Sequence, residues 1–377
     1  MIEKYLPEVC KIQYGFPFDS AQFSTDEGMP LIRIRDVVRG YSETFSTEKY
    51  KEEYVVHQND LLVGMDGEFN IAKWGKTPAL LNQRVCRLIP FPEEIDKNYL
   101  FYFMPSALKR IEEKTPFVTV KHLSAKELNK IIVPLPPLDE QRRIAAVLDK
   151  VTDLIAQRRA QLDKLDLLVK SRFVEMFGDP ACSTKWATKK LSQLGELNRG
   201  VSKHRPRNDP ALLGGPYPLI QTGDVSNSGL YITEHSASYS ELGLAQSRLW
   251  KAGTLCITIA ANIAQTSILT FDSCFPDSVV GFIPGNETNA IFMHYWFGFF
   301  QKILEEQAPQ VAQKNINLKI LSGLDVIVPP FDLQNKFAQF VSYVNIVRKD
   351  ITCSYEKLQG LQYSLEQNYF LVKNEKE

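Results

Sequence analysis

Residues 134–180 read PLPPLDEQRRIAAVLDKVTDLIAQRRAQLDKLDLLVKSRFVEMFGDP, and the rest of the chain is organised around this stretch. The Pro136-Pro137 pair cannot lie inside a helix, so a helix must begin after it. Asp139 and Glu140 follow at once, where acidic side chains stabilise the positive end of a helix dipole. A glycine and a proline, Gly178 and Pro180, mark the end.

The positions between these limits repeat in steps of four and three residues. Eight of the ten positions are apolar, which is the pattern of a helix that packs along one seam. The positions are Ile144, Leu148, Val151, Ile155, Arg158, Leu162, Leu165, Val169, Arg172 and Met176. The pattern predicts a coiled-coil helix about 60 Å long at ~1.5 Å per residue.

The same design returns near the C-terminus. The sequence PPFDLQ at Pro329–Gln334 repeats PPLDEQ at Pro136–Gln141 with a separation of 193 residues. The second seam is again apolar at all but two positions: Phe337, Val341, Val344, Arg348, Ile351, Tyr355, Leu358, Gln362, Leu365 and Tyr369. A second long helix is therefore predicted after Pro330.

The residues before each helix also correspond, at offsets that grow from 185 to 193 through small insertions. Leu6, Val9 and Gly15, for example, match Leu191, Leu194 and Gly200. The chain is thus predicted to be a duplicated unit of domain plus helix. The four segments are a first domain, 1–137, a first helix, 138–178, a second domain, 179–330, and a second helix, 331–377.

The duplication predicts a fold of the α+β class with two mixed domains. If the second domain has neighbouring ends, the second helix starts where the first stops and runs back along it. The two helices then form an antiparallel coiled coil, and a pseudo-twofold axis relates the halves. Shorter elements are also expected: strands at Leu31–Arg35, Asp60–Gly64, Pro218–Gln221 and Thr254–Ala260, and helices at Tyr99–Glu113 and Phe292–Glu306.

Composition is that of an ordinary globular protein. The 377 residues are 44% hydrophobic and 23% charged, with a formal net charge of zero. No signal-peptide pattern and no membrane-length apolar run is present, so we expect a cytoplasmic protein without membrane association. Six scattered cysteines without a C-x-x-C pair favour free thiols over a zinc site or a disulfide framework.

Catalytic motifs are missing. Gly75-Lys76-Thr77 resembles the end of a phosphate-binding loop, but Asn70 stands where that loop needs its first glycine. Val328 occupies the place of the hydrogen-bonding Asp or Asn in the Asp/Asn-Pro-Pro-aromatic motif of amino-methyltransferases. The five histidines show no metal-ligand spacing. We therefore predict no catalytic residues and no metal site.

The helix motifs carry a resemblance to a known family. PPLDEQ at Pro136–Gln141 and SRFVEMFGD at Ser171–Asp179 resemble the specificity (S) subunits of type I restriction-modification enzymes. The second copy departs from the motif at Leu333, which stands in place of Glu. The resemblance implies that each domain is a target recognition domain that reads one half of a bipartite site in double-stranded DNA. It also implies that the helices set the distance between the halves.

The resemblance further implies partners. The helices would dock two methyltransferase (M) subunits, and restriction (R) subunits would join through the complex. Adenine methylation and ATP-dependent cleavage would belong to those partners. S-adenosylmethionine, ATP and Mg²⁺ would then be used there, and this chain would bind no cofactor. The alternatives are a coiled-coil protein-interaction scaffold that does not bind DNA, and a nuclease in its own right.

DNA-contacting residues are predicted from side-chain chemistry, because Arg and Lys suit guanine or phosphate while Asn and Gln suit adenine. Seven basic residues and one acid between Lys185 and Arg207 predict a basic edge on the second domain, although such a run is also typical of a solvated surface. The candidates are Arg33, Arg35, Gln83, Arg84, Lys121, His122, Lys203, His204, Arg205, Arg207, Gln221, Thr222, Asn262, Gln265, Gln313 and Lys314.

Overall fold

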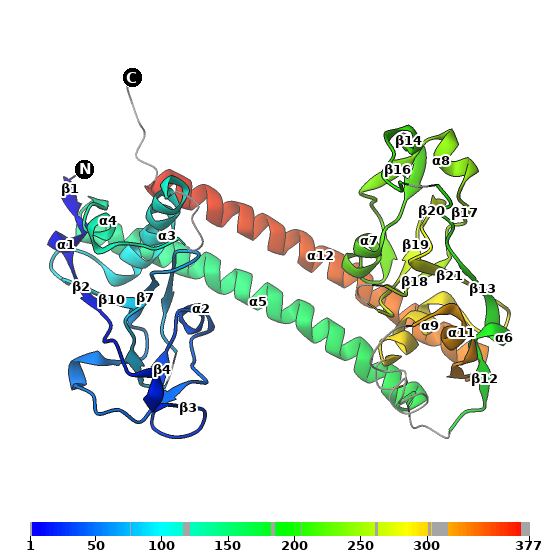
Figure 1. Cartoon of the computed structure of the whole chain (residues 1–377), viewed down its shortest axis with the longest axis horizontal. Coiled ribbons are helices and arrows are strands. Elements are labelled where there is room, and N and C mark those ends of the chain that lie inside the picture. The colour runs from blue at the N-terminus through cyan, green and yellow to red at the C-terminus, as the bar shows by residue number, and fades with distance from the viewer. Residues whose placement is uncertain are drawn as a thin grey trace. The chain divides into compact units, whose positions relative to one another are not determined.

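The chain divides into two compact units, here called unit 1 (residues 1–159 and 353–377) and unit 2 (residues 160–352). The computed structural model describes residues 2–75, 77–115, 121–181, 185–204, 206–260, 263–300, 303 and 316–370. Two 40-residue helices, α5 (Leu138–Phe177) and α12 (Phe331–Phe370), each contribute one part to unit 1 and the other part to unit 2 (Figure 1).

Unit 1 mixes short strands with a few helices. Its helices are α1 (Leu6–Val9), η1 (Ser20–Gln22), α2 (Asp36–Arg39), η2 (Glu52–Tyr54), α3 (Lys97–Lys114) and α4 (Ala125–Leu128). Its strands are β1 (Ile2–Tyr5), β2 (Cys10–Tyr14), β3 (Phe23–Ser24), β4 (Met29–Ile32), β5 (Phe45–Ser46), β6 (Val55–Val56), β7 (Leu61–Gly64), β8 (Asn70–Lys73), β9 (Ala79–Leu81), β10 (Val85–Pro90) and β11 (Ile132–Leu135).

The main sheet of unit 1 is antiparallel, in the order β2-β10-β7-β8. β7 is buried along its whole length, and its Leu61 and Val63 side chains share a core with helix α3. That helix starts at Asp96, whose carboxylate accepts the backbone N–H groups of Asn98 and Tyr99. A second sheet, β3-β5-β4-β9-β6, shares one small core with the main sheet through Leu62 and Val85, and covers another that contains Leu31 and Leu80. The site described below lies where these two sheets meet.

Unit 2 has the same order of elements. Its helices are α6 (Leu191–Leu194), η3 (Pro210–Leu212), α7 (Thr222–Asn227), α8 (Glu241–Ala245), α9 (Ala290–Phe297) and α11 (Leu318–Gly323). Its strands are β12 (Thr188–Lys190), β13 (Gly195–Arg199), β14 (Leu213–Leu219), β15 (Tyr231–Ile232), β16 (Ala237–Tyr239), β17 (Leu249–Trp250), β18 (Leu255–Thr258), β19 (Thr266–Leu269), β20 (Ser273–Cys274), β21 (Val279–Pro284) and β22 (Asp325–Ile327).

The main sheet of unit 2 runs β13-β21-β18-β19-β15, and a second sheet runs β16-β14-β20-β17. Strands β13, β21, β18 and β19 pair as β2, β10, β7 and β8 do in unit 1. Unit 2 differs by β15, which adds to β19 in parallel. Its core is rich in aromatic side chains from α9, including Phe292, Trp296 and Phe297.

Backbone hydrogen bonds recur between equivalent residues of the two units. The pairs are Leu6 N–H to Ile131 O and Leu191 N–H to Leu324 O, Gly15 N–H to Val85 O and Gly200 N–H to Val279 O, and Met65 N–H to Arg84 O and Ile259 N–H to Ser278 O. Gly15 and Gly200 are both in close contact with a backbone carbonyl. A Cβ atom at Gly15 would lie 2.0 Å from Asn82 O, and one at Gly200 would lie 2.3 Å from Phe275 O, so a side chain at either site would force the backbone to shift.

A buried glutamine follows each Pro-Pro motif and hydrogen-bonds back to it. The Gln141 side chain donates to Pro136 O at 2.9 Å and to Glu94 O, and accepts the backbone N–H of Asp96 at 2.9 Å. Gln334 repeats this arrangement. It donates to Pro329 O and to Glu287 O, and accepts a hydrogen bond from the Thr288 hydroxyl. Each glutamine thus joins the start of a long helix to the loop before α3 or α9.

The two long helices pack against each other within each unit. In unit 1 the early residues Ile144 and Leu148 of α5 share a core with Phe370 at the end of α12. In unit 2 Phe173, near the end of α5, lies edge-on to Phe337, near the start of α12, with ring centroids 5.3 Å apart. None of the twenty predicted seam positions is exposed, and those toward the middle of the helices are half-buried.

Several of the shorter predicted elements need correction. The strand expected at Leu31–Arg35 stops at Ile32, because the Asp36 carboxylate accepts the Arg33 N–H at 2.9 Å and turns the chain into α2. The strand expected at Pro218–Gln221 stops at Leu219, since Asp224 accepts the Gln221 N–H at 2.7 Å. The helix predicted at Tyr99–Glu113 is confirmed as α3. The helix α9 ends at Phe297, and most residues after Phe300 lie outside the described part of the chain.

Candidate nucleic-acid interface

In unit 1 three loops converge around one carboxylate, that of Asp66. Its Oδ1 lies 2.5 Å from His122 Nδ1, and its Oδ2 lies 3.4 Å from Arg84 Nε. Backbone bonds fix the three loops: Met65 N–H donates to Arg84 O, and Leu123 N–H donates to Met65 O. The fold therefore brings together two candidates, Arg84 and His122, that are 38 positions apart in sequence.

Lys121 precedes His122 but is directed elsewhere. Its ammonium donates to the backbone carbonyl of Glu112 at 2.8 Å and lies 3.6 Å from the carboxylate of the same residue. It therefore neutralises the negative end of helix α3, where four carbonyls have no helical partner. Gln83, in contrast, is exposed in the turn before β10, where its N–H donates to the Asn82 side chain.

Arg33 and Arg35 are exposed on the turn between β4 and α2. The residue between them, Ile34, lies against the end of β7, because a Cβ atom built on Gly64 would come within 3.3 Å of the Ile34 side chain. Gly64 stands two residues before Asp66. The turn thus packs on the strand that leads into Asp66, and Arg33, Arg35, Arg84 and His122 are all exposed.

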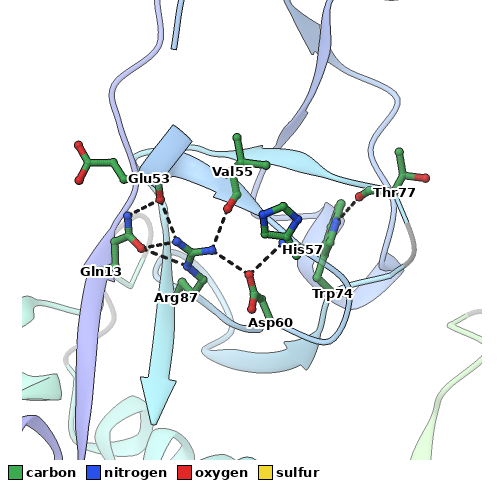
Figure 2. A network of polar contacts seen from close by, with 8 residues as sticks. All are labelled: Gln13, Glu53, Val55, His57, Asp60, Trp74, Thr77 and Arg87. Carbon is green, nitrogen blue, oxygen red and sulfur yellow. Dashed lines mark hydrogen bonds and ion pairs between the residues drawn. The ribbon is translucent and has the colours of Figure 1, made fainter. Parts of the chain in front are cut away.

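Another arginine of unit 1, Arg87, has a different role. Its guanidinium makes five hydrogen bonds, to Gln13 Oε1 twice and to Val55 O, Glu53 O and Asp60 Oδ2 once each (Figure 2). The side chain is only 12% exposed. All its donors face the protein, so Arg87 ties the segment before β7 to the main sheet and is not available to DNA.

In unit 2 the candidates from the basic run lie among acids from distant parts of the chain. Arg207 Nη2 donates to Asp277 Oδ1 at 2.6 Å, and His204 Nε2 lies 3.1 Å from Asp209. The pKa of Asp209 is lowered, first by the backbone N–H of Ala211 and then by His204. Lys189 also pairs with an acid far away in sequence, the carboxylate of Glu287. The run is basic in sequence but partly neutralised in the fold.

The remaining candidates of unit 2 lie on turns. Lys203 is exposed, and its backbone N–H donates to Gln246. Gln221 and Thr222 stand at the start of α7, in the position of Arg33 in unit 1. Gln265 is exposed in the hairpin between β18 and β19, next to Ala264, whose φ of 58° is left-handed. The candidates that lie outside the described residues are Arg205, Asn262, Gln313 and Lys314.

Sequence reasoning missed Asp66, because only donors to bases and phosphates were sought. The signal that could have found it is an acid just after an apolar strand and directly before a glycine, Gly67, which is a pattern typical of turns. Among the described residues no group of three or more His, Cys, Asp or Glu could hold a metal ion. Burial raises the pKa of the Cys10 and Cys86 thiols to about 12, so these two are unreactive core residues. No helix within the described ranges is long and apolar enough to cross a membrane.

Comparison with known proteins gives concordant matches. The family model described as "Type I restriction modification DNA specificity domain" matches residues 3–165 and 183–353. The type I restriction enzyme EcoBI specificity subunit of Escherichia coli is 28% identical over 96% of this chain and 83% of its own length. The putative type I restriction enzyme MjaX specificity subunit of Methanocaldococcus jannaschii is 21% identical over 87% of this chain and 80% of its own.

Solved structures agree on the fold. The S subunit of a type I restriction-modification system from M. genitalium aligns with a TM-score of 0.59 at 15% identity, covering 99% of this chain and 96% of that one. A chain from a study of complex assembly and conformational transition of the type I R-M system aligns with a TM-score of 0.56 at 16% identity over 98% and 97%. The predicted mixture of helices and sheets in two domains is confirmed at this level.

Proposed function

The chain belongs to the family of type I restriction-modification DNA specificity domains, and from this membership we propose that each of its two globular domains reads one half of a bipartite DNA site. The family model matches the chain twice, once in each half. The observation that carries the proposal is the combination of a repeated backbone with different surface residues. Equivalent hydrogen bonds hold both main sheets, while Arg33 and Arg84 of unit 1 correspond to Gln221 and Ser278 of unit 2. Two similar scaffolds with different donors suit two different half-sites.

The organisation that we propose has four parts: residues 1–137 and 179–330 as target recognition domains, and residues 138–178 and 331–377 as spacer helices. The helices pair as an antiparallel coiled coil about a pseudo-twofold axis. The packing of Phe173 on Phe337 and of Leu148 near Phe370 supports this arrangement. The matched glutamine contacts at the two helix starts support the repeat.

The catalytic steps would belong to partner subunits. We propose two methyltransferase subunits docked on the helices, with restriction subunits joining through them in the cytoplasm. S-adenosylmethionine, ATP and Mg²⁺ would be bound by those subunits. The chain itself would contribute DNA recognition, in keeping with a described surface that offers arginine, glutamine and histidine side chains on turns.

A domain exchange tests the proposal. Residues 179–330 are replaced by the equivalent domain of a relative, and the modified sequence is mapped by methylome sequencing in cells that carry the methyltransferase subunits. One half of the recognised sequence should change while the other stays the same. A change in both halves, or in neither, would refute reading by separate domains.

The spacer role has its own test. One heptad inserted after Asp163 and one after Glu356 keep both seams in phase and lengthen the pair by about 10 Å. At ~3.4 Å per base pair, this corresponds to roughly three more base pairs between the half-sites. Those base pairs also turn the DNA by about 100°, so a longer spacer or strongly weakened binding is expected. Full affinity for the original spacing would show that the helices do not set the distance.

A further inference from the structure

We propose that Asp66 is a positioning residue that orients Arg84 and His122 of unit 1, so that Arg84 reads a guanine in the half-site of this unit. The inference rests on the proposed function and adds to it a residue, a partner base and a direction of approach. It starts from the one described carboxylate of this surface that lies within 3.5 Å of two candidate DNA-binding side chains.

The position of Asp66 is fixed by the backbone. It lies two residues after β7 and forms an isolated antiparallel bridge with His122. Gly67, with a φ of 76°, completes the turn and donates its N–H to Lys121 O at 2.9 Å. The Asp66 side chain is 25% exposed, whereas those of Arg84 and His122 are 56% and 51% exposed. The carboxylate therefore lies below the two side chains, and they lie nearer to solvent.

The contacts leave specific atoms available. Asp66 engages Arg84 through Nε, and no hydrogen bond joins Nη1 or Nη2 of Arg84 to another described residue. Those two nitrogens form the planar fork that matches O6 and N7 of guanine in the major groove. Asp66 engages His122 through Nδ1, which leaves Nε2 directed away from the carboxylate. The ion pair at Nε, 3.4 Å long, favours one orientation of the fork, which base reading needs more than phosphate binding does.

Unit 2 lacks this arrangement. The pairing of Gly64 with Val85 in unit 1 corresponds to the pairing of Thr258 with Val279 in unit 2. Counting onward from these pairs, Asp66 corresponds to Ala260 and Arg84 to Ser278. Neither can form a carboxylate–guanidinium pair. The guanine reading is thus assigned to the half-site of unit 1 alone.

The test uses the full chain with its methyltransferase subunits and a duplex that carries the sequence mapped for the wild type. Each guanine of the two half-sites is replaced in turn by 7-deazaguanine, which lacks the N7 acceptor. At one guanine of the unit 1 half-site the wild type should lose about tenfold in affinity, as for loss of part of a bidentate contact. Asp66→Asn and Arg84→Lys should bind the unmodified duplex about tenfold more weakly and be insensitive to that replacement. Asp66→Glu should restore part of the sensitivity.

The control is Glu94→Gln, which removes another partly exposed ion pair of unit 1, that of Lys4 with Glu94. It should keep the wild-type response to every 7-deazaguanine. A purely structural role for Asp66 would lower the unfolding temperature and leave the sensitivity unchanged, and that result overturns the inference. So does a wild type that binds its own sequence specifically but responds to no guanine of the unit 1 half-site. A wild type that prefers its own sequence to a scrambled duplex by no measurable factor instead overturns the proposed function.

Discussion

The two units carry different residues at the same position of the main sheet: an arginine in unit 1, and a glycine covered by a tryptophan in unit 2. In unit 1, Arg87 of β10 stands opposite Gln13 of β2, and its guanidinium binds two side chains and two carbonyls (Figure 2). In unit 2 the matching pair is Gly281 opposite Asn198. The ring of Trp250 covers that glycine, since a Cβ atom there would lie 2.5 Å from the indole.

In unit 2 two further side chains, those of Phe275 and Arg248, pack against Trp250. Trp250 stacks on Phe275 with ring centroids 4.7 Å apart and an interplanar angle of 20°. Arg248 lies over the same indole at 3.9 Å and hydrogen-bonds Glu196 at 2.8 Å, which lowers the pKa of that carboxyl. In unit 1 the arginine, Arg87, is therefore the largely buried residue. In unit 2 the buried residue is Trp250, and the partly exposed Arg248 lies over its ring. The repeated backbone therefore constrains few side chains, so the two halves can diverge in surface and core.

The largest effect is expected from Trp250→Ala. The indole is 1% exposed, and its loss should reduce the free energy of unfolding by about 3–5 kcal/mol. Trp250→Phe is the matched control and should cost clearly less, because Nε1 has no hydrogen-bond partner among the described residues. Denaturant unfolding of the full chain, with hydrogen exchange to assign the loss to unit 2, measures both. Equal costs for the two variants would show that a phenyl ring recovers none of the packing of the indole, against this expectation.

The next effect is expected from Arg87→Ala in unit 1. The change removes five hydrogen bonds in a site where the arginine is 12% exposed, and Gln13 Oε1 and Val55 O lose the donors that Arg87 supplies. Glu53 O keeps the Gln13 amide as a donor, and Asp60 keeps the His57 N–H. We expect a loss of about 3 kcal/mol, since each unsatisfied buried group costs ~1–3 kcal/mol. Arg87→Lys keeps the charge and one donor direction, so it should lose less. Hydrogen exchange should show faster opening in β10 and β2. A loss below ~1 kcal/mol for Arg87→Ala would mean that the network is solvent-replaceable.

A smaller effect, shared by both units, is expected at the matched glycines. Gly15→Ala and Gly200→Ala each place a Cβ atom within 2.3 Å of a backbone oxygen, so the sheets must shift, at a cost of about 1–3 kcal/mol. Gly360→Ala is the control: nothing lies within 4 Å of its Cβ, and alanine favours the helix by roughly 0.5–1 kcal/mol. Thermal unfolding distinguishes them. Similar losses in the two units would support the repeat, and a loss in one unit only would weaken it.

The sequence predicted what depends on local pattern and on repetition. The two long helices were predicted from the proline pairs that precede them and from the repeat of apolar seam positions, which includes Leu148 in the first helix and Val341 in the second. It did not predict contacts that need the fold, such as Gln141 reaching Glu94 O or Asp66 reaching His122. Strand ends were predicted less well, because side-chain capping by Asp36 and Asp224 overrides an alternating pattern.

The candidate DNA-binding residues illustrate the same limit. Arg84 and Arg87 are three residues apart and look alike in sequence, yet one is exposed and the other is bonded inward. The difference depends on strand register, which sets the side chain of Arg87 beside Gln13. The basic run before Arg207 likewise could not reveal Asp277, which lies 70 positions away in sequence and 2.6 Å away in space.

The smallest effect concerns acid, and it should separate the units again. His294 of unit 2 hydrogen-bonds the Thr266 hydroxyl at 3.0 Å, and burial lowers its pKa to about 4. In unfolded chains the pKa of histidine is about 6.5, so unfolding takes up a proton below that pH. The stabilising contribution of neutral His294 is therefore complete above pH 6.5 and decreases as the pH falls toward 4. At pH 5 the loss should be about 1–2 kcal/mol, because part of the side chain remains exposed.

The measurement is the difference in unfolding free energy between wild type and His294→Gln from pH 7 to pH 4.5, which cancels the titration of the carboxylates. Hydrogen exchange at pH 5 should accordingly show faster opening of β19 and α9 than of the equivalent β8 and α3. An identical pH dependence for wild type and His294→Gln would mean that His294 is protonated at no cost in the folded unit, and the contrast between the two cores would then rest on Trp250 and Arg87 alone.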